Sequence, residues 1–227
     1  MSMHIGLIGG IGPAATVFYY KRIVQVFDDA AQPLHLTIAH TSARMLSRNV
    51  AAGRAEEQAE EYQRVAAQLA AAGADVVVIT SMGGHFCARE FAARSPLPMI
   101  DGPQAVAANL KAEGIARIGI LGTRIVMETA LYGELHELSV VTPTGAQREQ
   151  VNDDYVAMAI AGAATPDQRA RLIGAGARLV REQGAEAILL GGTDLNLVYR
   201  DANPGYRVID SAALHVDAIV RTALLAP

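Results

Sequence analysis

The sequence contains very little cysteine, and this scarcity narrows the chemistry that the protein could perform. Cys87 is the single cysteine among 227 residues, which excludes an internal disulfide and any metal site made of cysteines alone. The six histidines show no His-x-x-x-His spacing, so we expect no structural metal ion. No stretch approaches the roughly 20 consecutive apolar residues of a membrane helix, and no secretion signal opens the sequence. We therefore expect a cytoplasmic protein that has no membrane partner.

A strong positive charge is also lacking. The formal net charge is −4, and the sequence contains no run of lysine and arginine and no motif that reads DNA or RNA. These features exclude nucleic acid as an expected partner. Hydrophobic residues make up 51% of the chain and charged residues 19%, which is typical of a globular protein with a substantial core.

Two similar apolar stretches organise the chain. Residues 74–79 are mostly β-branched and flanked by glycines, which predicts a buried parallel strand followed by Thr80 and Ser81. The pattern returns at residues 185–194, at an offset of 111 (185 − 74), so that Gly192 becomes the counterpart of Ser81. Because open α/β sheets bind ligands at the carboxyl ends of their strands, these two positions are predicted to face each other in the active site.

Two further landmarks repeat at nearly the same offset. Residues 4–8 match residues 117–121 at an offset of 113 (119 − 6), and the segment ending at Asp101 matches that ending at Asp210 at 109 (210 − 101). Such repetition indicates an internal duplication, and alternating strands and helices predict parallel sheets flanked by helices. We predict an α/β fold of two similar lobes, with the active site in the cleft between them. The predicted lobes are residues 1–101 with the C-terminal segment 208–227, and residues 102–207.

The hydrophobic periodicity predicts the individual elements. The loop at residues 40–54 is predicted to be irregular and to face the substrate, because it carries Arg44, Arg48 and Arg54, and a guanidinium can bind a carboxylate through two hydrogen bonds. Strands are expected at 4–8, 34–39, 74–79, 96–101, 117–121, 139–141, 185–190 and 208–210, and helices at 14–28, 55–72, 85–93, 104–113, 128–138, 151–161, 167–183 and 211–224.

The glycine-rich turn at residues 9–12 does not meet the G-x-G-x-x-G spacing of dinucleotide-binding proteins. No acidic residue ends the second predicted strand either, so no nucleotide cofactor is expected. The amide groups of this turn, at a helix N-terminus, could instead hold a carboxylate. Asp101 and Asp210 each precede a helix and are interpreted as N-caps. His85 could orient a ligand or cap a helix, and His215 could be a packed helix residue.

Four segments of the chain match motifs of a known protein family. They are G-L-I-G-G-I-G-P-A-A-T at 6–16, L-G-T-R-I-V-M at 121–127, P-T-G-A-Q at 143–147 and I-D-S-A-A-L-H at 209–215. Together these segments resemble the aspartate/glutamate racemase family, a group of cofactor-independent amino-acid racemases with two lobes. The resemblance covers nearly the whole chain and implies an isomerase that acts on a small carboxylate or amino acid, and that forms a homodimer.

The chain departs from the family where the family carries its catalytic cysteines. The family motifs T-C-N-T-A-H and G-C-T-E-L stand here as T-S-M-G-G-H at 80–85 and G-G-T-D-L at 191–195. Ser81 and Gly192 thus replace the two thiols that move the α-proton, so the two-thiol mechanism is not available. On the resemblance, the catalytic candidates are Ser81, His85, Thr193 and Asp194, with no metal and no cofactor. The substrate-binding candidates are Gly10, Gly12, Arg48, Thr80, Met82, Gly83, Thr123 and Gly192.

Three interpretations therefore stay open. The first is a racemase-like enzyme with altered acid and base groups. The second is lyase or hydrolase chemistry in which Ser81 is the nucleophile and His85 its partner. The third is a relative that binds a small anion without turnover. Cys87 lies six residues after Ser81 and is interpreted as a packed, inert thiol.

Overall fold

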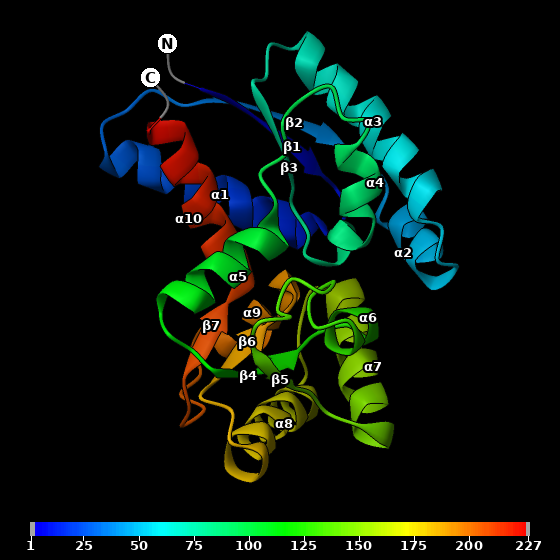
Figure 1. Ribbon diagram of the computed structural model, residues 1–227, viewed down its shortest axis with the longest axis vertical. Helices are drawn as coiled ribbons and strands as arrows, with labels where there is room; N and C mark the ends of the chain where they lie inside the picture. The colour runs from blue at the N-terminus through cyan, green and yellow to red at the C-terminus, as the bar shows by residue number, and fades with distance from the viewer. Residues whose placement is uncertain (1–2, 226–227) are drawn as a thin grey trace. The chain divides into compact units, whose positions relative to one another are not determined.

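A computed structural model describes residues 3–225 of the chain. The chain divides into two α/β units, which we call the first and second lobes (Figure 1). The first lobe comprises the chain up to Ala105 and again from Ala213 onward, and the second lobe is Val106–Ala212. The chain passes from one lobe to the other inside α5 (Gly102–Ala112) and returns inside α10 (Ser211–Leu224). Within the described residues, no helix is both long and apolar enough to cross a membrane.

The sheet of the first lobe has three parallel strands in the order β2-β1-β3. Its central strand is buried along almost its whole length, as expected for an apolar strand covered on both faces. The predicted fourth strand at residues 96–101 contributes only one isolated bridge, between Met99 and Val77. Pro96 and Pro98 lie in this segment, and proline has no amide hydrogen to donate to a neighbouring strand. The strands are β1 (His4–Gly9), β2 (His35–His40) and β3 (Val76–Ile79).

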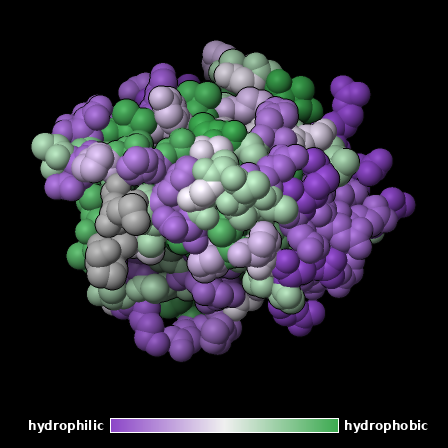
Figure 2. Space-filling view, turned by 90° about the horizontal axis from the view of Figure 1, so that it is seen from above, coloured by the Kyte–Doolittle hydropathy of each residue, from purple (hydrophilic) through white to green (hydrophobic). Residues whose placement is uncertain are grey.

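Helices cover both faces of this sheet. Figure 1 shows α1 and α10 on one side and α2, α3 and α4 on the other. A hydrophobic core lies between the sheet and α3, where Tyr62, Leu69 and Phe91 are fully buried against Val77 and Ile79. The opposite face of α3 is rich in glutamate, and Figure 2 shows hydrophilic residues gathered on that side. The helices are α1 (Pro13–Asp29), α2 (Ala43–Ala51), α3 (Ala55–Ala71), the 3-10 turn η1 (Gly83–Cys87) and α4 (Ala88–Ala92).

The prediction of an irregular loop at residues 40–54 was wrong, because α2 forms there. Ser42 caps this helix by accepting a hydrogen bond from the amide of Met45 (3.3 Å). Its buried face contains Leu46 and Asn49, and the Asn49 amide donates to the side chain of Gln58 on α3 (3.0 Å). Since half of that buried face is polar, hydrophobic periodicity alone does not reveal the helix.

The second lobe has four parallel strands in the order β5-β4-β6-β7. The last of these strands pairs with β6, so the segment at 208–210 belongs to the second sheet and not to the first lobe, to which the sequence assigned it. The strands are β4 (Arg117–Leu121), β5 (Ser139–Val141), β6 (Ala187–Leu190) and β7 (Val208–Asp210). The helices are α6 (Arg124–Glu128), α7 (Gly145–Ala161), α8 (Pro166–Gln183), the 3-10 turn η2 (Thr193–Leu195) and α9 (Asn196–Tyr199).

The helix predicted at residues 128–138 does not form. Ala130, Leu131, Tyr132 and Gly133 all have positive φ angles, between 50° and 84°, so the chain turns in the left-handed sense. Leu131 and Leu135 are buried four residues apart, the spacing that had suggested a helix. Burial of these two leucines thus comes from a tight turn, at a cost of about 1 kcal/mol for each non-glycine residue held in that conformation.

The internal duplication is also visible in the hydrogen bonds at the amino ends of the strands of each sheet. The Asp75 carboxylate accepts a hydrogen bond from the amide of His4 (2.7 Å) at the start of β1. The Glu186 carboxylate does the same for Arg117 (2.8 Å) at the start of β4. Asp75 directly precedes β3 and Glu186 directly precedes β6, the two strands that match in the sequence repeat, so the repeat extends from the sequence pattern to individual hydrogen bonds.

Candidate active site

In the first lobe, the carboxyl ends of β1 and β3 are joined by threonine hydroxyls. Thr80, which is fully buried, donates from Oγ1 to the carbonyl oxygen of Ile8 (2.9 Å). Its Oγ1 also lies 3.0 Å from that of Thr16 on α1. The amide of Gly10 in turn donates to Thr16 Oγ1 (3.0 Å). Two predicted ligand residues, Thr80 and Gly10, therefore already bond to groups of their own lobe.

The turn after β1 needs glycine at Gly10, where φ is +83°. A side chain there would overlap the ring of His40 and the carbonyl oxygen of Thr41 at the end of β2. Gly12, with φ +130°, then begins α1, and Pro13 occupies the first helical position. The turn therefore brings the helix N-terminus up to the strand ends, as the sequence predicted.

His85 is held on both sides of its ring by backbone groups. Its Nδ1 donates to the carbonyl oxygen of Ser81 (2.8 Å), and its Nε2 accepts from the amide of Gly102 (3.2 Å). These bonds assign the tautomer, and burial lowers the pKa of the imidazole, which is therefore neutral. The hydroxyl of half-buried Ser81 instead accepts from the amide of Gly84 (3.3 Å). Both ring nitrogens of His85 thus bond to backbone groups and not to the Ser81 hydroxyl, so this geometry does not support a nucleophile–base pair.

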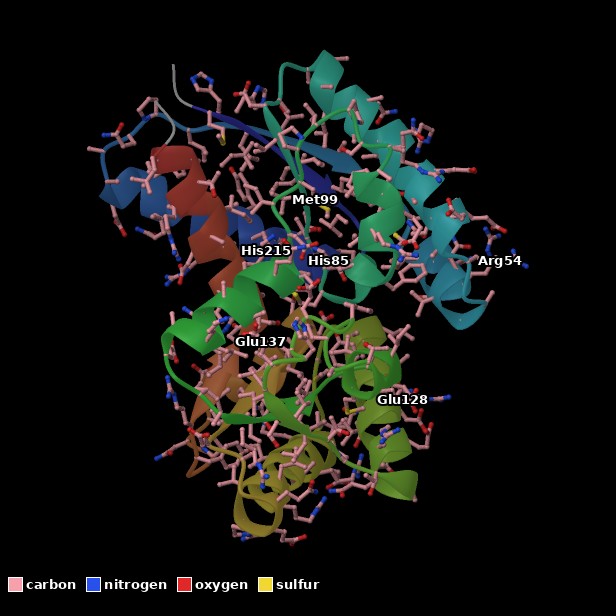
Figure 3. The ribbon with its side chains drawn as sticks, in the orientation of Figure 1. Arg54, His85, Met99, Glu128, Glu137 and His215 are labelled. Carbon is pink, nitrogen blue, oxygen red and sulfur yellow. The ribbon has the colours of Figure 1, made fainter. Side chains whose placement is uncertain are left out.

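His215 completes a buried cluster of rings with His85. Its Nε2 donates to the carbonyl oxygen of Ile100 and its Nδ1 accepts from the Tyr19 hydroxyl, both at 2.9 Å. The two imidazoles meet edge to face with centroids 5.6 Å apart, and Figure 3 shows them side by side. Burial, together with the neighbouring His85, lowers the pKa of His215 to about 3. His215 is thus a packed helix residue, as proposed from the sequence.

The other first-lobe candidates differ in their exposure to solvent. Met82 is buried and Gly83 begins the turn η1, both directly after the predicted strand end. Arg48 is exposed on α2. Asp101 accepts a hydrogen bond from the amide of Gln104 (3.0 Å), which is the helix-capping role expected for it.

Cys87 is buried in the core between the sheet and α3. Its Sγ lies 3.8 Å from the carbonyl oxygen of Gly84, and burial raises the pKa of the thiol to about 12. Because the thiolate is the reactive form, we expect no measurable labelling of native protein by a thiol reagent at pH 8 within an hour, and one thiol per chain in 6 M guanidinium. Rapid labelling of the native protein would contradict this placement.

In the second lobe, two threonine hydroxyls lie at the carboxyl ends of the neighbouring strands β4 and β6. Thr123 begins α6, yet its side chain caps no amide of that helix. Thr193 follows β6 in η2 and is 6% exposed. Both Oγ1 atoms are buried, and within residues 3–225 neither has a hydrogen-bond partner. A buried polar group without a partner is destabilising, so such groups mark positions where a ligand can bind.

Tyr155 reaches the same strand end from α7. Its hydroxyl donates to Oδ2 of Asp194 (3.3 Å). A Cβ atom built on Gly192 would lie 2.7 Å from Cε2 and from Cζ of the Tyr155 ring, and closer still to its hydroxyl. The tyrosine ring thus occupies the space that a side chain at position 192 would need.

One face of α7 spans both strand ends. Asn152 and Tyr155 are three residues apart and therefore lie on the same side of the helix. The Asn152 side chain accepts from the amide of Arg124 beside Thr123 (2.9 Å), while Tyr155 reaches Asp194. The buried carboxylate of Asp154 receives two hydrogen bonds from Arg171 on α8, both 2.7 Å. This bidentate pair and Asn152 fix the position of α7 and hence that of the tyrosine.

Comparison with known proteins places the chain in a family. A family model described as Asp/Glu/Hydantoin racemase matches residues 8–219. The chain belongs to this family. A proposed Asp/Glu racemase from Yersinia pestis is 30% identical, with a TM-score of 0.84 over 98% of this chain and 99% of that one. An aspartate racemase homologue from Pyrococcus horikoshii shares the fold at 23% identity, with a TM-score of 0.79 over 97% and 99% of the two chains.

An arylmalonate decarboxylase shares the fold of this racemase-family chain at 19% identity, with a TM-score of 0.52 over 97% of this chain and 92% of that one. Among residues 3–225, no three histidine, cysteine, aspartate or glutamate side chains are grouped so that they could hold a metal ion.

Sequence reasoning missed Tyr155 as a residue of this racemase-family site. It expected a helix at 151–161, whereas α7 begins six residues earlier, at Gly145. The tyrosine lies 37 residues before Gly192, so no motif links the two positions. The three-residue spacing of Asn152 and Tyr155 predicts that they share one helix face. This spacing points to the candidate site only when β4 and β6 are known to be neighbouring strands.

Proposed function

We propose that this protein is a racemase-like isomerase that moves a proton at the carbon next to the carboxylate of a small acid, without a pair of thiols. Membership of the racemase family supports the reaction class. The observation that carries the proposal is the pair of buried, unpaired hydroxyls of Thr123 and Thr193 at neighbouring strand ends. A substrate carboxylate would accept a hydrogen bond from each, and bonds to a charged group each contribute about 1.5–3 kcal/mol. As the family resemblance implies, we expect a cytoplasmic homodimer that uses no cofactor.

The geometry favours this proposal over chemistry with Ser81 as a nucleophile. A serine hydroxyl needs an adjacent base, and both ring nitrogens of His85 are engaged by backbone groups. Binding without turnover is the outcome against which the proposal is tested.

The direct test is hydrogen exchange. The protein is incubated in D₂O with each enantiomer of aspartate and of glutamate, and with other small carboxylic acids, and loss of the α-hydrogen signal is followed by NMR. The proposal predicts exchange of at least one acid well above the rate without protein. Thermal stabilisation by an acid that shows no exchange would instead identify a binding protein.

The two hydroxyls should contribute to substrate binding. Changing Thr193 or Thr123 to valine keeps the side-chain volume and removes the donor, so we expect KM for the exchanging acid to rise about tenfold or more. Thr222→Val is the matched control, because Thr222 is exposed on α10 and its hydroxyl donates to the carbonyl oxygen of Ala218 (2.8 Å). Unchanged KM in both site variants would remove the threonines from the binding site.

A further inference from the structure

We propose that Tyr155 is the residue that exchanges a proton with the substrate carbon in the second lobe, with Asp194 as its proton partner. This inference rests on the proposed function and assigns an acid and base to it. It starts from the position of the tyrosine ring, which fills the space beside Gly192, the residue that directly precedes Thr193.

Gly192 follows β6, and any other residue at this position would project a side chain beyond the carboxyl end of that strand. The backbone there is extended, with φ −164° and ψ 139°, which any residue can adopt. The glycine is therefore not required by the backbone. It is required by the ring of Tyr155, whose Cε2 and Cζ would lie 2.7 Å from a Cβ atom. The phenol thus brings a protonated oxygen to the place from which a residue at 192 would act.

The electrostatics keep that oxygen protonated until the reaction. Burial, and next the negative charge of Asp194, raise the pKa of Tyr155 well above its ordinary value. Burial likewise raises the pKa of Asp194. A phenolate beside a carboxylate is disfavoured, so a proton taken up by the phenol oxygen must be matched by one released to the carboxylate.

The proton path follows from this pairing. In the forward step, the Cα–H bond of the substrate breaks and the proton moves to Oη of Tyr155, while the phenolic proton moves to Oδ2 of Asp194. The electron pair of the broken bond stays on the substrate and is delocalised into its carboxylate group. In the return step, Tyr155 gives a proton back to Cα and recovers one from Asp194. No oxidant, reductant or other reactant is needed.

The neighbouring groups do not offer an equal alternative. Thr193 carries a hydroxyl that is far too weakly acidic to act alone, and the imidazole of His85 is engaged on both sides by its own lobe. Tyr155, in contrast, has a carboxylate acceptor and a fixed position on α7 through Asp154 and Arg171. A single-oxygen change to its side chain can therefore test the assignment.

The test compares Tyr155→Phe with wild type in the D₂O exchange of aspartate and glutamate. General acid–base catalysis typically contributes 10²–10⁴-fold, so we expect kcat for exchange to fall at least about 100-fold in the variant. Thermal stabilisation by the same acid should persist, because the threonine donors are intact. Tyr206→Phe is the matched control, since it removes another partly buried phenol oxygen of the second lobe, one that bonds to Tyr199 and Ile173.

Asp194→Asn is the second variant. It tests the same proton path even if the Tyr155→Phe protein fails to fold. It keeps the shape of the side chain and removes the proton acceptor, so exchange should fall to a similar degree. Wild-type exchange that survives in both variants would overturn the assignment of Tyr155 while leaving the proposed function in place. Wild-type protein that exchanges no acid would overturn both.

Discussion

Between pH 7 and pH 4.5, the wild-type protein should lose about 2.5 kcal/mol of unfolding free energy through His215 alone. Its pKa is lowered from 6.5 to about 3 in the folded state. Below pH 6.5 the unfolded chain binds a proton at this residue and the folded chain does not, so stability falls as the pH falls. Each pH unit in this window costs about 1.4 kcal/mol.

The other buried groups of the first lobe act in the same direction. The pKa of His85 is also lowered by burial, although the carboxylate of Asp101 opposes this. The two rings meet edge to face, so a charge on one would disfavour a charge on the other. Asp194 works in the opposite sense, because its pKa is raised and its contribution to stability grows as the pH falls.

Urea unfolding at pH 7.0, 6.0, 5.0 and 4.5 checks this expectation. His215→Gln should be less stable than wild type at pH 7, because it leaves a buried partner unsatisfied, but its stability should fall more slowly with acid. His136→Gln is the control, since His136 is exposed, and its curve should run parallel to that of wild type. Parallel curves for His215→Gln and wild type would mean that His215 is not buried in its neutral form.

Changing Gly192 to alanine should abolish most of the exchange activity and also destabilise the second lobe. Because the backbone at this position is extended, the cost comes only from the clash with Tyr155. Inserting a methyl group into a packed site typically costs 1–3 kcal/mol. The ring would move away from Asp194, and we expect exchange to fall about 100-fold, as far as in Tyr155→Phe.

A double-mutant cycle separates this clash from other effects. In a Tyr155→Ala background, alanine at position 192 should cost almost nothing, so the coupling free energy between the two sites should be about 1–3 kcal/mol. Gly174→Ala serves as the control, because a Cβ atom on that α8 glycine would meet only the flexible end of Arg178, at 3.7 Å. Additive effects of the two substitutions would show that the ring does not occupy the space beside Gly192.

The inner strands could be predicted because β1, β3, β4 and β6 are short, buried and apolar, and the chain repeats them. The prediction failed where a local pattern and a tertiary contact disagree. The α2 helix buries Asn49 against Gln58, and a hydrophobic pattern cannot predict this polar contact. Leu131 and Leu135 have helical spacing, yet the left-handed conformation of residues 130–133 prevents an α-helix there.

For the candidate site residues, the sequence predicts positions along the strands but not the hydrogen bonds that they make. The strand-end positions of Thr123, Thr193 and Asp194 follow from the repeat. The engagement of His85 depends on the amide of Gly102, which begins a helix 17 residues later, and no property of either residue alone implies this bond. Tyr155 lies near Gly192 only because α7 packs on η2, a tertiary contact that the sequence does not reveal.

The ring of Tyr155 beside Gly192 also has an evolutionary consequence. A side chain at 192 and a large aromatic residue at 155 compete for one volume, so the two positions cannot diverge independently. A lineage that gains a side chain at the first must first, or at the same time, shrink the second. Among relatives with this α7 geometry, residues at these two positions should therefore covary in size, with glycine accompanying the large ring and a bulkier residue accompanying a smaller partner.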